Sequence, residues 1–120
     1  MATRRLANYL KTYRKRSGLT QREVAFLLGW KHGEQLLRYE KHHRIPPFQI
    51  ALAFEAIFKV PVTELFAGAN DSVVGEIGTR IETLAAELQN RNDRGKEARH
   101  TARKLSWLAA NHSRQNSSNQ

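Results

Sequence analysis

The sequence contains no cysteine, which excludes both a disulfide framework and a thiolate site. Acidic residues are scarce, with 11 Asp and Glu against 20 Lys and Arg, and no apolar run approaches the roughly 18 residues that a membrane span needs. The basic first residues are not followed by the apolar core of a signal peptide. These absences favour a cytoplasmic protein that does not enter a membrane, from a bacterium or a bacterial mobile element.

The positive charge that is present is unevenly distributed. The net charge is +9, and Met1 to Phe66 holds 12 Lys and Arg against 5 Asp and Glu, while the remainder holds 8 against 6. With 120 residues, 40% of them hydrophobic, the chain can build one compact domain and an appendage. A basic first half makes a polyanionic partner, above all a nucleic acid, the first candidate.

Apolar residues recur at helical spacing, which predicts an all-α protein. In the first half we expect helices over residues 4–16, 21–28, 33–40, 48–58 and 63–66, the fourth being central, buried and opened by Pro47. In the second half we expect helices over 71–89 and 96–110. The predicted organisation is a domain at 1–68, a helical region at 69–111, and a disordered Ser/Asn/Gln-rich tail at 112–120.

Two of these short helices have the marks of a helix-turn-helix. Thr20 and Glu23 have the spacing of a capping box directly before an apolar run, so the second helix begins at Gln21. Gly29 follows its end and can adopt a positive φ in the turn. Two short helices joined through such a glycine predict a helix-turn-helix.

The strings SGLTQREVAFLLGW, LLRYEKHHRIPP and VPVTELF carry a resemblance to a known family. In their order and spacing, residues 6–66 resemble the lambda-repressor-like, Cro-type helix-turn-helix domain of XRE-family regulators. The resemblance implies a five-helix DNA-binding domain followed here by one or two further helices. The residues that it assigns to the framework of the motif are Thr20, Glu23, Ala25, Gly29, Leu36 and Tyr39.

The third helix is the expected recognition helix. Leu36 and Tyr39 are spaced to face the core, so the other side of the helix faces outward. Side-chain geometry in the major groove favours Gln35 with adenine and Arg38 with guanine. Leu37 has two interpretations, contact with a thymine methyl or packing at the edge of the core. The predicted base-contacting residues are Gly33, Glu34, Gln35, Leu37 and Arg38, in a segment one residue longer than the commonest family pattern.

Polar and basic residues on both sides of this helix are the expected contacts to phosphate. By the resemblance, Gln21 begins the second helix where a phosphate would lie. The alternative for Gln21 is an exposed residue at a helix start, and the alternative for the basic residues is a solvated charged loop. Trp30 is expected to pack on the domain rather than to stack on DNA. The predicted phosphate-contacting residues are Gln21, Arg22, Lys31, His32, Lys41, His42, His43 and Arg44.

Beyond Asp71, apolar residues are spaced 3, 4, 3 and 4 apart, as in an a/d stripe. This stripe pairs with a second copy in one interpretation and folds against the last helix of its own chain in the other. We favour the homodimer. The residues predicted at its interface are Val74, Ile77, Ile81, Leu84 and Leu88.

These features together predict a transcriptional repressor that binds double-stranded DNA sequence-specifically, as a homodimer on a pseudo-palindromic operator. Two alternatives remain: an autoregulator of the antitoxin or restriction-controller type, and a basic module that binds an acidic protein. No catalytic set is visible, and adjacent His42 and His43 lack a third ligand at standard spacing. We therefore expect no enzymatic activity, metal, cofactor or small-molecule ligand.

Overall fold

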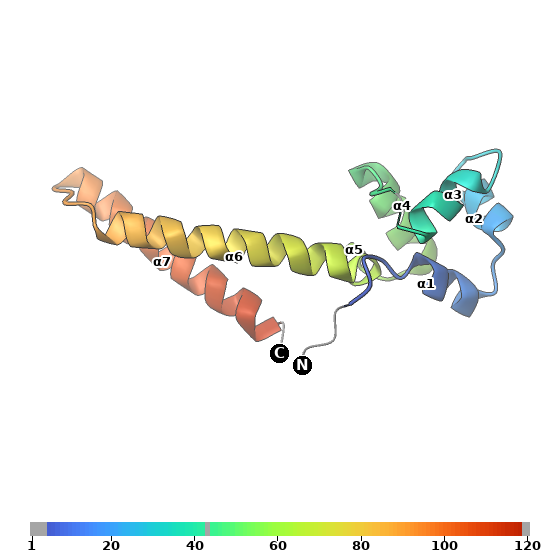
Figure 1. Ribbon diagram of the computed structural model, residues 1–120. Coiled ribbons are helices and arrows are strands. Elements are labelled where there is room, and N and C mark those ends of the chain that lie inside the picture. The colour runs from blue at the N-terminus through green and yellow to red at the C-terminus, as the bar shows by residue number, and fades with distance from the viewer. Residues whose placement is uncertain (1–4, 43, 119–120) are drawn as a thin grey trace. The chain divides into compact units, whose positions relative to one another are not determined.

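The computed structural model describes residues 5–42 and 44–118, with side chains described as far as residue 110. Over these residues the chain forms seven α-helices and no strand, which confirms the all-α prediction. It divides into two compact units, Met1–Asp71 and Ser72–Gln120, and one helix runs from the first into the second. The helices are α1 (Leu10–Ser17), α2 (Gln21–Leu27), α3 (Glu34–Glu40), α4 (Phe48–Phe58), α5 (Val62–Leu65), α6 (Ala67–Gln89) and α7 (Lys96–Ser118) (Figure 1).

The first helix begins later than the sequence predicted. It was expected over 4–16, but α1 starts at Leu10, and residues 5–9 are not helical. Their backbone groups bond instead to the far end of the unit: the Tyr9 N–H donates to the Leu65 carbonyl at 2.7 Å. The Leu6 carbonyl accepts from the Gly68 N–H at 2.8 Å. These long-range bonds replace the local helical ones, and the Leu6 side chain is left half-exposed.

The core of the first unit gathers around Phe54 of α4. Its ring meets Tyr39 edge-on at a centroid distance of 6.2 Å and lies 6.3 Å from the ring of Phe66. Because Tyr39 belongs to α3, this aromatic contact fixes α3 against α4. The buried core residues are Leu10, Val24, Leu36, Tyr39, Ala51, Phe54, Leu65 and Phe66.

Helix α4 has the predicted bounds, but the prediction that it is buried holds for one face only. Only Ala51 and Phe54 are buried, while Phe48 and Leu52 are exposed. The helix therefore packs through one face. Pro47 lies at the N-cap rather than inside the first turn, which leaves its missing N–H without consequence for the helix.

Gly68 lies in the first turn of α6, which begins four residues before the predicted start at Asp71. A Cβ on Gly68 would lie 2.5 Å from the Leu6 carbonyl oxygen. The glycine therefore allows residues 5–9 to lie directly against α6. Arg5 adds an ion pair with Asp71 on the same helix, and this pair raises the pKa of Arg5 and lowers that of Asp71.

In the second unit, α6 and α7 form a helical hairpin joined through residues 90–95 (Figure 1). Leu88 is buried, and the Thr101 hydroxyl donates to the Asp93 carboxylate at 2.6 Å. The backbone of α7 continues to Ser118, beyond the predicted end at residue 110, and residues 119–120 lie outside the described residues. None of the described helices is long and apolar enough to cross a membrane.

Candidate nucleic-acid interface

The start of α2 is fixed by a complete capping box. The Glu23 N–H donates to the Thr20 hydroxyl at 3.1 Å, and the Thr20 N–H donates to the Glu23 carboxylate at 2.9 Å. The bond from the Thr20 N–H, with a further contribution from its hydroxyl, lowers the pKa of Glu23. Gln21 and Arg22 are consequently held in the first turn of the helix.

The turn between α2 and α3 depends on Gly29. Its φ is +80°, in the left-handed region that residues with a side chain rarely adopt. The Trp30 N–H donates a hydrogen bond to the Ala25 carbonyl at 2.8 Å. Trp30 is partly buried against the core, and its ring lies 5.9 Å from the ring of Tyr39. Trp30 therefore packs on the domain, as the sequence suggested.

Helix α3 is anchored from beneath. Leu36 and Tyr39 are buried beneath it, and the carbonyl of Tyr39 accepts a hydrogen bond from the side chain of Asn8 at 2.8 Å. The side-chain oxygen of Asn8 also accepts from the Leu10 N–H at 3.2 Å, so one buried amide joins the start of α1 to the end of α3. These contacts hold one face of α3 inward.

A polar cluster joins α1, α2 and α3. The Arg14 guanidinium donates to both carboxylate oxygens of Glu40, at 2.6 and 3.1 Å, and the Gln21 amide nitrogen donates to the same carboxylate at 3.2 Å. Gln21 was predicted to contact a phosphate, and in the structure its side chain also donates a hydrogen bond inside the domain. Neither Arg14 nor Asn8 was singled out from the sequence, because their partners lie 26 and 31 residues away with no local pattern to connect them.

The opposite face of α3 is turned outward. Glu34 and Arg38 are exposed, and Gln35 and Leu37 are partly exposed. Gly33 lies at the N-cap and packs against Gln21, since a Cβ there would be 3.5 Å from backbone and side-chain atoms of that residue. The five residues predicted to contact bases thus occupy the start and the outer side of one short helix.

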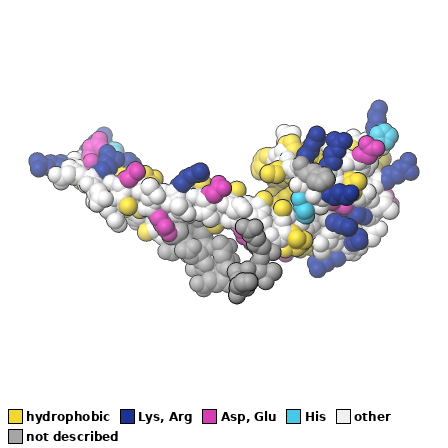
Figure 2. All heavy atoms as spheres, in the orientation of Figure 1, with side chains coloured by type: hydrophobic (Ala, Val, Ile, Leu, Met, Phe, Trp, Pro, Cys, Tyr) yellow, Lys and Arg dark blue, Asp and Glu magenta, His cyan; other side chains and the backbone are white. Residues whose placement is uncertain are grey.

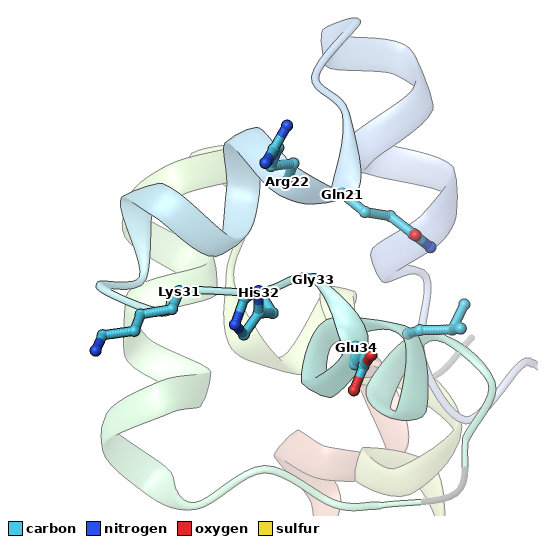
Figure 3. Close-up of a pocket in the computed structure, with 7 residues that line it drawn as sticks. Gln21, Arg22, Lys31, His32, Gly33 and Glu34 are labelled. Carbon is cyan, nitrogen blue, oxygen red and sulfur yellow. The ribbon is translucent and has the colours of Figure 1, made fainter.

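Two open hollows flank the start of α3. The first, of about 380 Å³, lies between the beginnings of α2 and α3, as Figure 3 shows for Gln21, Arg22, His32 and Glu34. The second, of about 510 Å³, lies on the side of Gln35 and Arg38. Three residues line both hollows: Lys31, His32 and Glu34.

Basic side chains are present on both sides of the helix. Arg22 and Lys31 line the first hollow, and Arg44 lines the second. Lys41 and His42 are exposed after the end of α3, His42 with a positive φ of 66°, while His43 lies outside the described residues. On the face that Figure 2 shows, Lys and Arg side chains are numerous over this first unit.

This arrangement defines a class: a small helical domain that presents an exposed polar helix, braced from beneath and bordered by cations. Residues 10–65 match the family model described as helix-turn-helix. This segment belongs to the XRE, lambda-repressor-like type of helix-turn-helix domain, which is a DNA-binding domain of transcription regulators. Searches of curated proteins and of solved structures found no match.

Proposed function

We propose that this protein is a cytoplasmic transcriptional repressor that binds a pseudo-palindromic operator as a homodimer, with α3 of each copy in the major groove. The proposal rests on the difference between the two sides of α3, one of which is buried and the other accessible. Its inner side is held by Leu36, Tyr39 and the Arg14–Glu40 pair, while its outer side is polar and accessible. Such a helix can approach base edges without unfolding its support.

Each outward residue has a chemical role in this proposal. Arg38 donates two hydrogen bonds to guanine O6 and N7, and Gln35 pairs with adenine N6 and N7. Glu34 accepts from cytosine N4, and Leu37 packs against a thymine methyl. Gly33, at the start of α3, has no side chain and so allows this part of the helix to approach the duplex closely.

Contacts to the backbone of the DNA set the register of the helix in the groove. Lys31 and His32 border both hollows, and we assign them to the DNA strand nearest the start of α3. Gln21 keeps one amide hydrogen for a phosphate while donating the other to Glu40. The other proposed phosphate contacts are Arg22, Lys41, His42, His43 and Arg44.

Residues 1–68 would then be the DNA-binding domain and residues 69–111 the dimerisation region. Within the second unit, Ile81 and Leu105 line one groove and Leu88 is buried, so part of the predicted stripe is occupied by the chain's own α7. Of the rest of the predicted stripe, Ile77 and Leu84 stay exposed by 40% and 45%, and Val74 is partly buried. Val73, one turn before Ile77, was not among the predicted residues and is 58% exposed. We assign Val73, Ile77 and Leu84, here called the α6 strip, to the second copy.

The need for a partner follows from the small size of this unit. A helical hairpin of about 50 residues buries little apolar surface by itself, and small units are generally stabilised by disulfides, metals or oligomerisation. The sequence has no cysteine, and the described residues hold no cluster of three metal-ligating side chains. A second copy on the α6 strip would bury it.

Selection of bound duplexes from a random DNA pool tests the proposal. We expect a motif with two inverted half-sites, and a selected pool without any common sequence would contradict it. Dimerisation is tested separately by sedimentation of Leu84→Glu, which should be monomeric. Ala86→Glu, on the same helix but on the other side, is the matched control and should remain a dimer.

A further inference from the structure

The outer face of α7 carries a concentration of cations that the proposed function does not use. At 3.6 residues per turn, the side chains involved fall within an arc of about 140°. All of them are exposed. They are Lys96, Arg99, His100, Arg103, Lys104 and Trp107, and we call this set the α7 basic face.

Along the part of α7 whose side chains are described, no acidic residue falls within this arc. Arg99 and Arg103 are four residues apart, as like charges that repel each other on a helix surface. Glu97 is the single acidic residue of α7, and its carboxylate lies 4.0 Å from Arg91 in the loop. The α7 basic face therefore offers a row of cations to an external anion.

Trp107 lies near the middle of this arc, one turn after Arg103, and is 67% exposed. A nucleic acid matches both kinds of group on this face, since phosphates pair with guanidinium and ammonium groups while an exposed indole can pack on sugar or base.

A membrane surface fits less well. A helix that lies in a bilayer interface exposes a broad apolar face. The apolar side of α7 is instead turned toward α6, where Leu105 and Leu108 line a groove with Ile81 and Ala85. Among the described residues of α7, the cationic side is exposed and the leucines are not.

We propose that the α7 basic face is a second DNA-binding site, which contacts the phosphate backbone of duplex DNA outside the operator. The inference rests on the proposed function, because α3 brings the same chain to a duplex and so raises the effective concentration of DNA around α7. The contact adds affinity for longer DNA without adding sequence preference.

The test compares the selected operator with the same operator extended by about 10 base pairs, one helical turn, on each side. Wild type should bind the extended duplex at least about tenfold more tightly at moderate salt, with a steeper dependence of log K on log salt. The triple variant R99Q/R103Q/K104Q should lose this gain, and its salt slope on the extended duplex should fall by about 2 to 3. Its preference for operator over scrambled core sequence should be unchanged.

The matched control removes three exposed cations elsewhere, as K11Q/K15Q/K59Q, and should keep the gain from extension. Trp107→Ala should lower the gain without changing the salt slope. An unchanged gain in R99Q/R103Q/K104Q, with helicity preserved, would overturn the inference, as would a loss of equal size in the control. Binding of wild type to anionic lipid vesicles that the triple variant abolishes, without any effect on DNA, would assign the face to a membrane instead.

The two proposals fail separately. If wild type prefers no sequence but the triple variant still lowers the salt slope, the α7 inference stands and sequence-specific recognition by α3 falls. If the sequence preference is present and extension gives no gain, only the α7 inference falls.

Discussion

Arg14 on α1 and Glu40 at the end of α3 form a two-pronged ion pair inside the domain, with side-chain exposures of 12% and 2%. Two parallel N–H donors match the two carboxylate oxygens, so the pair fixes direction as well as distance. Because Glu40 is the last residue of α3, this contact sets how α3 is held against α1.

Loss of one partner should be costly. In Glu40→Ala a largely buried guanidinium keeps its charge without a counterion, so the free energy of unfolding should fall by about 3 to 5 kcal/mol. Urea denaturation measures this change. Glu34→Ala, an exposed glutamate of the same helix, is the control and should change stability by less than about 0.5 kcal/mol.

Replacing both partners distinguishes the charge from the packing. In R14M/E40L neither buried charge is left alone, so the double variant should be more stable than Glu40→Ala. A double variant as unstable as Glu40→Ala would mean that the ion pair is not the source of the loss.

The N-cap of α2 gives a second stability prediction. Thr20→Ala removes the acceptor of the Glu23 N–H and should cost about 1 kcal/mol. Thr63→Ala, at an exposed threonine in α5, serves as the comparison. If the two variants lost the same free energy of unfolding, the capping box would not be what stabilises α2.

The same capping box predicts a pH dependence. The pKa of Glu23 is lowered chiefly by the Thr20 N–H, so the folded state binds this proton less readily than the unfolded state does. Its stabilisation is present in full above the ordinary glutamate pKa and is lost as the pH falls through the lower folded-state pKa. The Tm difference between wild type and Glu23→Gln should therefore be largest near neutral pH and shrink in acid. A difference independent of pH would contradict this.

Gly68 and Gly75 form a matched pair in α6. Gly68→Ala places a methyl group 2.5 Å from the Leu6 carbonyl oxygen, so it should destabilise the fold by more than about 1 kcal/mol. Gly75→Ala meets no atom within 4 Å and should stabilise by up to about 1 kcal/mol through helix propensity. Thermal unfolding of both variants gives the comparison, and a neutral Gly68→Ala would show that residues 5–9 do not rest on α6.

Local signals predicted the centre of the first unit well. The Thr20–Glu23 spacing predicted the start of α2, and Gly29 predicted the turn after it. Both predictions succeeded because capping and positive φ depend on residues that are close in sequence. Periodicity likewise gave α4 its bounds. Leu36 and Tyr39 are buried as their spacing indicated, which determines which side of α3 faces outward.

Such local signals could not predict the contacts between residues that are far apart in the sequence. Residues 5–9 look helical by pattern, but their backbone bonds to Leu65 and Gly68 on the far side of the unit. Gly68 is a site of close approach to Leu6, which no local pattern around it indicates. The bond from Asn8 to Tyr39 joins residues whose relation appears only in three dimensions.

The central claim is that the outward side of α3 reads base pairs, and Arg38 tests it most directly. The measurement is the affinity of wild type and Arg38→Ala for the selected operator and for every single-base substitution in one half-site. Arg38→Ala should bind the operator about 1 to 3 kcal/mol more weakly and lose discrimination at one G·C pair while keeping it elsewhere. A variant that keeps every base preference of wild type, or a wild type with none, would contradict the account.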